Sequence, residues 1–124
     1  MAYKIIWEEK GILVTFSDTV TEQEVKAVND IIYGDKRFDA ITYQIADYSG
    51  ASNILISPKD AKIIGILDRT SSIWNPRRVR NVVVTKNLQF IPIAEIYLRE
   101  FEGTPWEGRI FETLEQAYEW IKAD

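Results

Sequence analysis

The sequence contains no cysteine and no histidine. This lack excludes disulfides, thiolate nucleophiles, zinc sites built from Cys or His, and Ser-His-Asp catalytic triads. Any acid–base chemistry would fall to Asp, Glu, Lys or Tyr, whose ordinary pKa values lie far from neutrality. The acidic residues show no spacing of the EF-hand type. We therefore expect no metal, no cofactor and no enzymatic activity.

Long apolar runs and an excess of positive charge are also missing. No stretch approaches the ~20 apolar residues of a membrane span, and the N-terminus lacks a secretory h-region. The formal net charge of −4 argues against nonspecific binding to nucleic acid or anionic membranes, because both need a cationic face. With 124 residues, 46% of them hydrophobic, we expect one globular domain over residues 1–124, in the cytoplasm.

Alternation of apolar and polar residues predicts the strands. The Lys10-Gly11 pair between the first two alternating runs predicts the turn of a β-hairpin. The unbroken apolar run Val82–Val84 is typical of a strand covered on both faces in a parallel sheet. Strands are predicted over residues 3–9, 12–17, 40–46, 79–85 and 107–112.

Capping residues predict where the helices begin. Thr21 with Glu24, and Thr113 with Gln116, each have the spacing of a capping box, and Ser57 precedes a proline that suits a first helical turn. Helices are predicted from Thr21 to Gly34, from Ser57 to near Trp74, from Ile91 to Phe101, and onward from Thr113. The order ββαβαβαβα predicts an α/β fold with a mostly parallel central sheet, an N-terminal hairpin and four helices.

Three stretches, "GILVTFSDTVTEQEV", "QIADYSG" and "RIFETLEQAYEWI", carry a family resemblance. Together with the element order they resemble the STAS superfamily, and more closely its stand-alone SpoIIAA-like bacterial branch, which is related to lipid-binding CRAL-TRIO domains. The anti-sigma-factor antagonists of that family have Asp-Ser-Ser-Gly where this chain has Asp47-Tyr48-Ser49-Gly50. The resemblance implies that Ser49 matches a serine phosphorylated by a partner kinase. Here, "ASNILI" separates Gly50 from the Ser57 cap.

A candidate site lies at the carboxyl ends of the predicted strands. In open α/β sheets, ligands sit beyond these ends, where the strand order reverses. Asp47, Tyr48 and Ser49 follow the third strand, and Thr85 and Asn87 follow the fourth. We expect them to form a ligand- or partner-binding site. Alternatively, Asp47 and Ser49 hydrogen-bond the amides of their own loop, as such residues commonly do in turns.

A second candidate surface is the arginine-rich stretch that follows the second predicted helix. Trp74, Arg77 and Arg78 could receive a phosphorylated or acidic partner, because guanidinium groups pair bidentately with such groups. The alternative is a solvated connection whose arginines offset the excess of Asp and Glu. Trp74 and Trp106 lie near predicted loops, and we expect both to be exposed.

The sequence leaves three functions to compare. The first is a non-enzymatic, STAS-like regulatory domain that binds a protein partner or a small ligand and forms a homodimer. The second is a carrier or sensor of an apolar, lipid-like ligand held between the sheet and the second and third helices; an apolar cavity next to Trp74 would favour it. The third, an enzyme using Asp47, Tyr48 or Lys86, is disfavoured by the lack of His and Cys.

Overall fold

The computed structural model describes residues 3–123, in which five strands alternate with helices in the predicted order. The strands are β1 (Tyr3–Trp7), β2 (Gly11–Thr21), β3 (Tyr43–Leu55), β4 (Arg80–Val84) and β5 (Glu107–Phe111). The helices are α1 (Glu22–Tyr33), α2 (Pro58–Arg69), the short α3 (Ser71–Trp74), α4 (Ile91–Arg99) and α5 (Leu114–Lys122), with a 3₁₀ turn η1 at Lys36–Ala40.

The strands form a single sheet in the order β1-β2-β3-β4-β5. The hairpin strands β1 and β2 are antiparallel, and every other neighbouring pair is parallel. The predicted α/β fold and its mostly parallel sheet are confirmed. Because the strands follow one another in chain order, the sheet contains no point at which the order reverses.

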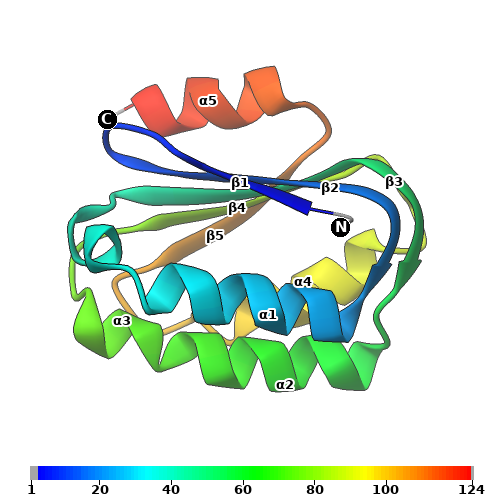
Figure 1. Cartoon of the computed structure of the whole chain (residues 1–124), viewed down its shortest axis with the longest axis horizontal. Coiled ribbons are helices and arrows are strands. Elements are labelled where there is room, and N and C mark those ends of the chain that lie inside the picture. Colours follow the sequence, from blue (N-terminus) through cyan, green and yellow to red (C-terminus); the bar gives the residue numbers. More distant parts are fainter. Residues whose placement is uncertain (1–2, 124) are drawn as a thin grey trace.

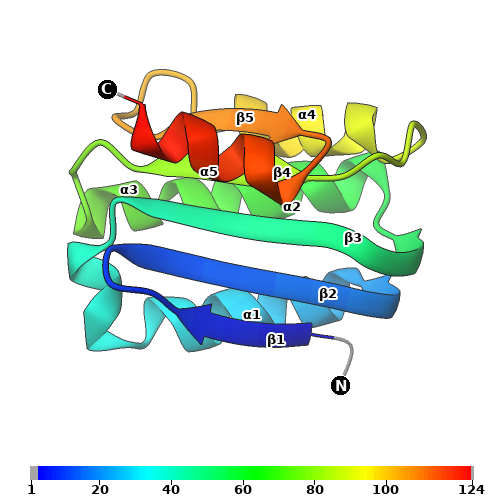
Figure 2. The same ribbon diagram turned by 90° about the horizontal axis from the view of Figure 1, so that it is seen from above.

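Three helices cover one face of the sheet and a single helix covers the other. In Figures 1 and 2, α1, α2 and α4 lie on one side of the sheet and α5 lies alone on the opposite side. The larger core lies under the three helices and the smaller one under α5. Val83 faces the larger core while Val82 and Val84 face the smaller one, which confirms that this strand is covered on both faces.

Helix α5 is tied to the start of the chain through one carboxylate. Glu8, just after β1, accepts hydrogen bonds from the Tyr43 hydroxyl at 2.5 Å and from the Tyr118 hydroxyl at 2.8 and 2.9 Å. Tyr118 lies on α5, so these bonds join the hairpin, β3 and the last helix. The same contacts hold α5 over the smaller core.

The predicted helix starts are confirmed. Thr21 and Thr113 each form a complete capping box with the residue three positions later, and Ser57 forms a further one with Asp60. The helix after Thr21 also ends before Gly34, as predicted.

Two predicted helix ends were too late. The second helix ends at Arg69 instead of running to Trp74, and a separate short α3 follows Thr70. The hydroxyls of Thr70, Ser71 and Ser72 each donate to the carbonyl three residues earlier, which competes with the regular helical bonding pattern. The helix predicted to reach Phe101 ends at Arg99.

Two strands are longer than predicted. Strand β3 was expected over residues 40–46 but continues to Leu55, and β2 continues to Thr21 alongside it. The ladder between them shifts register twice, so that β3 carries extra residues opposite β2. Such bulges bend a strand and increase its twist. Figure 1 shows the ends of both strands curving toward α1 and α2.

The two tryptophans expected at the surface differ in their exposure to solvent. Trp74 is 76% exposed, as predicted, whereas Trp106 is 2% exposed and that prediction is wrong. The Trp106 ring stacks on Phe101 with ring centres 5.5 Å apart, and its indole N–H donates to the Asn75 carbonyl at 3.0 Å. A buried tryptophan needs such a partner for its N–H, and the backbone provides it.

No helix within residues 3–123 is long and apolar enough to cross a membrane.

Replacing each of these tryptophans with alanine should separate core from surface. Trp106→Ala removes a buried ring and leaves a cavity, so we expect the free energy of unfolding to fall by about 3–5 kcal/mol. Trp74→Ala removes an exposed ring, so we expect a change within about 0.5 kcal/mol. Urea unfolding followed by circular dichroism measures both, and similar losses in the two variants would contradict the assignment.

Candidate functional site

The segment Asp47–Gly50 lies inside β3 and is not a loop beyond its end. Asp47 still pairs with Thr15 on one side and Val84 on the other, and Gly50 pairs with Ser17. The expectation that Asp47, Tyr48 and Ser49 follow the end of the third strand is therefore wrong. The segment lies at the first register shift, where β3 begins to bend away from β4.

Each residue of this segment has a local structural role. The Tyr48 ring is buried between Phe16 and Phe90, with ring centres 4.7 Å from each. A Cβ on Gly50 would lie 2.9 Å from the Phe16 carbonyl oxygen, so the close approach of β2 requires glycine. Asp47 accepts hydrogen bonds from the amide and hydroxyl of Ser49 at 2.9 and 2.6 Å.

Thr85 and Asn87 likewise bond to nearby backbone. The Thr85 hydroxyl oxygen accepts from the Asn87 amide at 3.1 Å. The Asn87 side chain accepts from the amides of Gln89 and Phe90 at 2.9 and 3.2 Å, just before α4 begins. Among the hydrogen bonds of residues 3–123, none joins Thr85 or Asn87 to Asp47 or Ser49.

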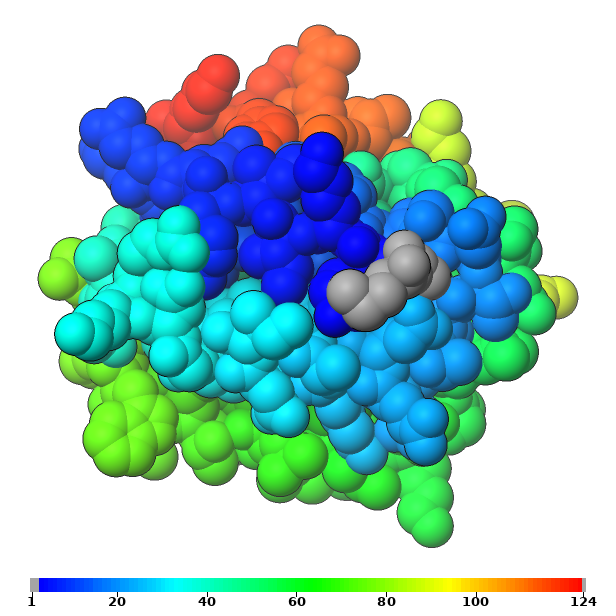
Figure 3. Space-filling view, in the orientation of Figure 1, coloured from blue at the N-terminus to red at the C-terminus, as the bar shows by residue number. Residues whose placement is uncertain are grey.

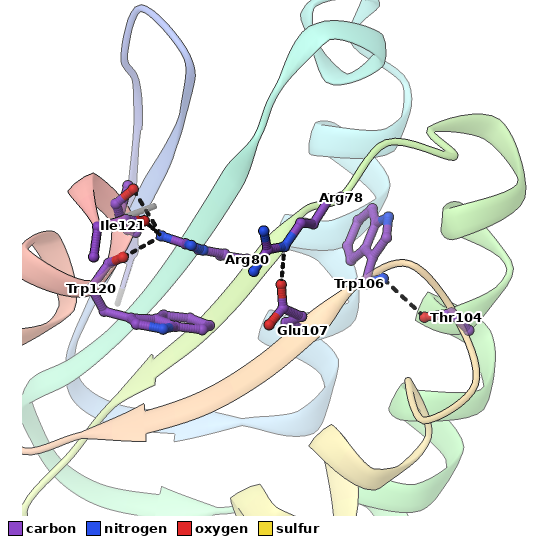
Figure 4. Close-up of polar contacts among 8 residues, drawn as sticks. Arg78, Arg80, Thr104, Trp106, Glu107, Trp120 and Ile121 are labelled. Atoms are coloured by element: carbon purple, nitrogen blue, oxygen red, sulfur yellow. Dashed lines mark hydrogen bonds and ion pairs between the residues drawn. The ribbon is translucent and has the colours of Figure 1, made fainter.

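The arginine-rich stretch after α3 is partly engaged in holding the fold. Figure 4 shows the Arg78 guanidinium paired with Glu107 on β5. It also shows Arg80 donating to the carbonyls of Trp120 and Ile121 at the end of α5, a favourable place for a cation. Trp74 and Arg77 remain exposed at the surface.

A buried polar cluster lies on the side of α2 that faces α1, α4 and the sheet. The predictions made from the sequence did not include it. Its centre is Asp68, which is 3% exposed and faces the sheet and its two neighbouring helices. The Asn29 amide of α1 donates to both carboxyl oxygens of Asp68, at 3.0 and 2.8 Å. The Tyr97 hydroxyl of α4 donates to one of them at 3.0 Å.

The cluster continues from α4 into the sheet. The Asn81 amide of β4 donates to the Tyr97 hydroxyl at 3.2 Å, and the Gln44 amide of β3 donates to the Asn81 side-chain oxygen at 3.2 Å. The Gln44 side-chain oxygen is buried and makes no hydrogen bond. The buried Tyr33 hydroxyl lies close to Asp68 and Gln44 but makes no hydrogen bond of normal geometry.

This polar cluster forms one end of an internal cavity. The cavity has a volume of about 70 Å³ and lies between the sheet and α1, α2 and α4. A single water needs about 10–15 Å³, so the space holds several waters or a small organic molecule. Asn29, Gln44, Asp68, Asn81 and Tyr97 contribute polar groups to its wall. Its apolar wall includes Val14, Val28, Ile64, Val83, Phe90 and Ala94.

Burial dominates the electrostatics of the cluster. It raises the pKa of the Asp68 carboxyl to about 7, because the charged form loses its hydration, while hydrogen bonds from Tyr97 and Asn29 act in the opposite direction. Burial also raises the pKa of Tyr97 well above its usual range. Strongly shifted ionisable groups in a cavity are typical of functional sites, so this cluster is the strongest candidate in the molecule.

Residues 3–123 contain no group of three or more Asp or Glu side chains placed to hold a metal ion.

No protein-family model and no curated protein matches the chain. Among solved structures, it is similar to the anti-sigma factor antagonist SpoIIAA in its unphosphorylated form, with a TM-score of 0.63 and 11% identity over 99% of this chain and 100% of that one. It is also similar to an uncharacterized protein of the DUF3478 family with a SpoIIAA-like fold from Shewanella loihica PV-4, with a TM-score of 0.49, 14% identity, and coverage of 96% and 91%. The resemblance expected from the sequence is confirmed for the fold: the chain has a SpoIIAA-like α/β fold.

Asp68 should make stability depend on pH in a direction unusual for an acidic residue. Its pKa is higher in the folded protein than in the unfolded chain, so between about pH 4 and 7 the folded state holds a proton that the unfolded state has released. We expect this group to lower the free energy of unfolding by about 1.4 kcal/mol per pH unit as pH rises through that window, with no further loss above it.

Asp68→Asn should remove this contribution. Urea unfolding of both proteins at several pH values from 4.5 to 8 measures it, and the variant should gain stability relative to the original protein as pH rises. Asp39→Asn makes the same chemical change at an exposed position and serves as the control. Parallel curves for Asp68→Asn and the original protein would contradict the assignment.

Proposed function

We propose that this protein is a non-enzymatic, STAS-like binding domain that holds a small, largely apolar ligand in the cavity between the sheet and α1, α2 and α4. The observation that carries the proposal is the cavity itself, with its apolar walls and single polar end. Ligand sites commonly combine an apolar lining with a few convergent polar groups. The site expected from sequence beside Trp74 is not part of this cavity, because Trp74 lies exposed at the end of α3.

Packing considerations support a cavity kept for binding. Protein interiors are close-packed, and each unfilled volume costs contacts that a larger side chain could make. Here small side chains, Ala61 and Ala94, face the space from α2 and α4, and both are buried. Larger apolar side chains at these two positions would reduce the volume of the cavity. The small size of Ala61 and Ala94 therefore helps to keep it open.

A regulatory role is part of the same proposal. One solved structure, similar to this chain over 99% of its residues, is an anti-sigma factor antagonist in its unphosphorylated form. Ser49 stays a predicted phosphorylation site, supported by its exposure on β3. Ser49 lies beside the Asp47 carboxylate. The strand from Ser49 to Leu55, roughly 20 Å when measured along the chain, separates it from the start of α2. Like-charge repulsion and distance from free helix amides both disfavour a phosphate there.

A second candidate function is protein–protein binding through an apolar area that we call the α2–α3 surface. Its residues are Ile63, Ile66, Leu67, Ile73 and Trp74, which are 39–76% exposed. These two helices form the lower rim of the molecule in Figure 3. Exposed apolar areas of this kind are typical of interaction sites, and the adjacent Arg77 adds a residue type enriched in interfaces.

Filling the cavity should abolish ligand binding without unfolding the protein. Xenon is a suitable probe, because apolar walls of protein cavities bind it and a single atom is smaller than benzene. We expect saturable shifts of amide NMR signals confined to residues that line the cavity, and we expect Ala94→Leu to remove them. Ala27→Leu, the same change on the exposed face of α1, should leave them intact. Absence of saturable binding to the original protein would contradict the proposal.

The α2–α3 surface is tested by self-association. If it mediates a homodimer, sedimentation velocity at increasing concentration should show a shift from monomer to dimer, and Trp74→Ala should move that shift to higher concentration. Lys62→Ala, on the same helix but outside the apolar area, is the matched control. A purely monomeric protein at every concentration would contradict homodimer formation.

A further inference from the structure

The polar end of the cavity offers hydrogen-bond acceptors that the protein itself leaves unsatisfied. The side-chain hydrogen bonds form a chain that runs from Gln44 through Asn81 and Tyr97 to Asp68, with a further donor from Asn29. These donors are used within the cluster, and the Tyr33 hydroxyl is a donor that makes no hydrogen bond of normal geometry. The Gln44 oxygen at the start of the chain also has no partner of normal geometry. A carboxylate has about four acceptor positions, so Asp68 also retains capacity beyond its two donors.

The cluster contains no cation to balance Asp68. Helix α1 contributes Asn29, Tyr33 and the nearby acidic Asp30, and α4 contributes Tyr97. The two strands contribute only the neutral amide side chains Gln44 and Asn81. The ion pairs at Glu22, Asp35 and Glu107 do not reach Asp68. A buried carboxylate without a counter-ion is unfavourable, and burial accordingly raises the pKa of Asp68.

We propose that the cavity binds a small primary amine in its protonated form, with the ammonium group on Asp68 and Gln44 and the hydrocarbon part against Val28, Ile64 and Ala94. This inference rests on the proposed function and names the class of its ligand. An ammonium group carries a positive charge, which the cluster lacks, and three donors for its remaining acceptor positions. The share of liquid volume of one water is about 30 Å³, so the cavity suits an amine of about two to three non-hydrogen atoms.

The proposal predicts a specific coupling between binding and protonation. Asp68, with a pKa of about 7 in the empty protein, must lose its proton to pair with the ammonium group. Binding at pH 6 should therefore release close to one proton. The affinity should rise about tenfold per pH unit below 7 and level off above it. Tyr33 and Tyr97, the other ionisable groups in contact with the site, stay neutral throughout this range because burial raises the pKa of each.

Two probes of the same shape test the head group: ethylamine and ethanol, titrated by NMR at pH 7.5. We expect the amine to bind at least tenfold more tightly than the alcohol. Asp68→Asn should erase this preference, and Asp39→Asn should preserve it. Calorimetry at pH 6 in buffers of different ionisation enthalpy measures the proton release.

A second variant keeps the test informative should Asp68→Asn unfold. Gln44→Leu removes the unsatisfied acceptor and should weaken the amine several-fold while leaving the alcohol unchanged. Equal affinities for amine and alcohol in the original protein would overturn this inference. If xenon still bound, the proposed cavity function would stand; if none of the three probes bound, both would fall.

Discussion

The handedness of the parallel crossovers determines where everything else in this molecule lies. Connections between parallel strands are right-handed, and in this sheet each one advances by a single strand in the same direction. Successive crossovers of the same hand and direction must place their helices on the same side. This puts α1, α2 and α4 together on one face and leaves the other to α5 (Figure 2). A site between helices can form only on the face that α1, α2 and α4 cover, and the cavity lies there.

Within that layer, a closely packed helix contact lies next to the open cavity. Gly65 lets α2 approach α4 closely, since a Cβ there would lie 2.9 Å from the Tyr97 carbonyl oxygen. The same approach brings Asp68 within reach of the Tyr97 hydroxyl. Tight contact between these two helices and open space beside Ala94 therefore occur side by side. By contrast, Asp47 and Ser49 lie outside this layer and hydrogen-bond to each other.

Local patterns in the sequence were sufficient to predict the element order and most element boundaries. Capping boxes such as Thr21 with Glu24 depend on residues three positions apart, and a run such as Val82–Val84 reports burial directly. The extension of β3 could not be predicted in this way, because "DYSGASN" has turn-forming residues and gains its strand conformation only by pairing with β2. The burial of Trp106 could not be predicted for a similar reason. It depends on contacts with Phe101 and Asn75, and no periodic pattern in the sequence links either residue to Trp106. Asp68 did carry a signal. It lies four residues after Ile64 and seven after Ala61, which places it on the buried side of the helix.

The bond between Glu8 and Tyr118 spans 110 residues, almost the whole described chain. Consequently, the face of the sheet formed by Leu13, Ile45 and Val82 has no cover until the last helix has been synthesised and has left the ribosome. A nascent chain that already possesses its hairpin, its parallel strands and the three-helix layer still presents this apolar face to the cell. A chain that stops short of Tyr118 would expose a surface suited to aggregation or to capture by chaperones.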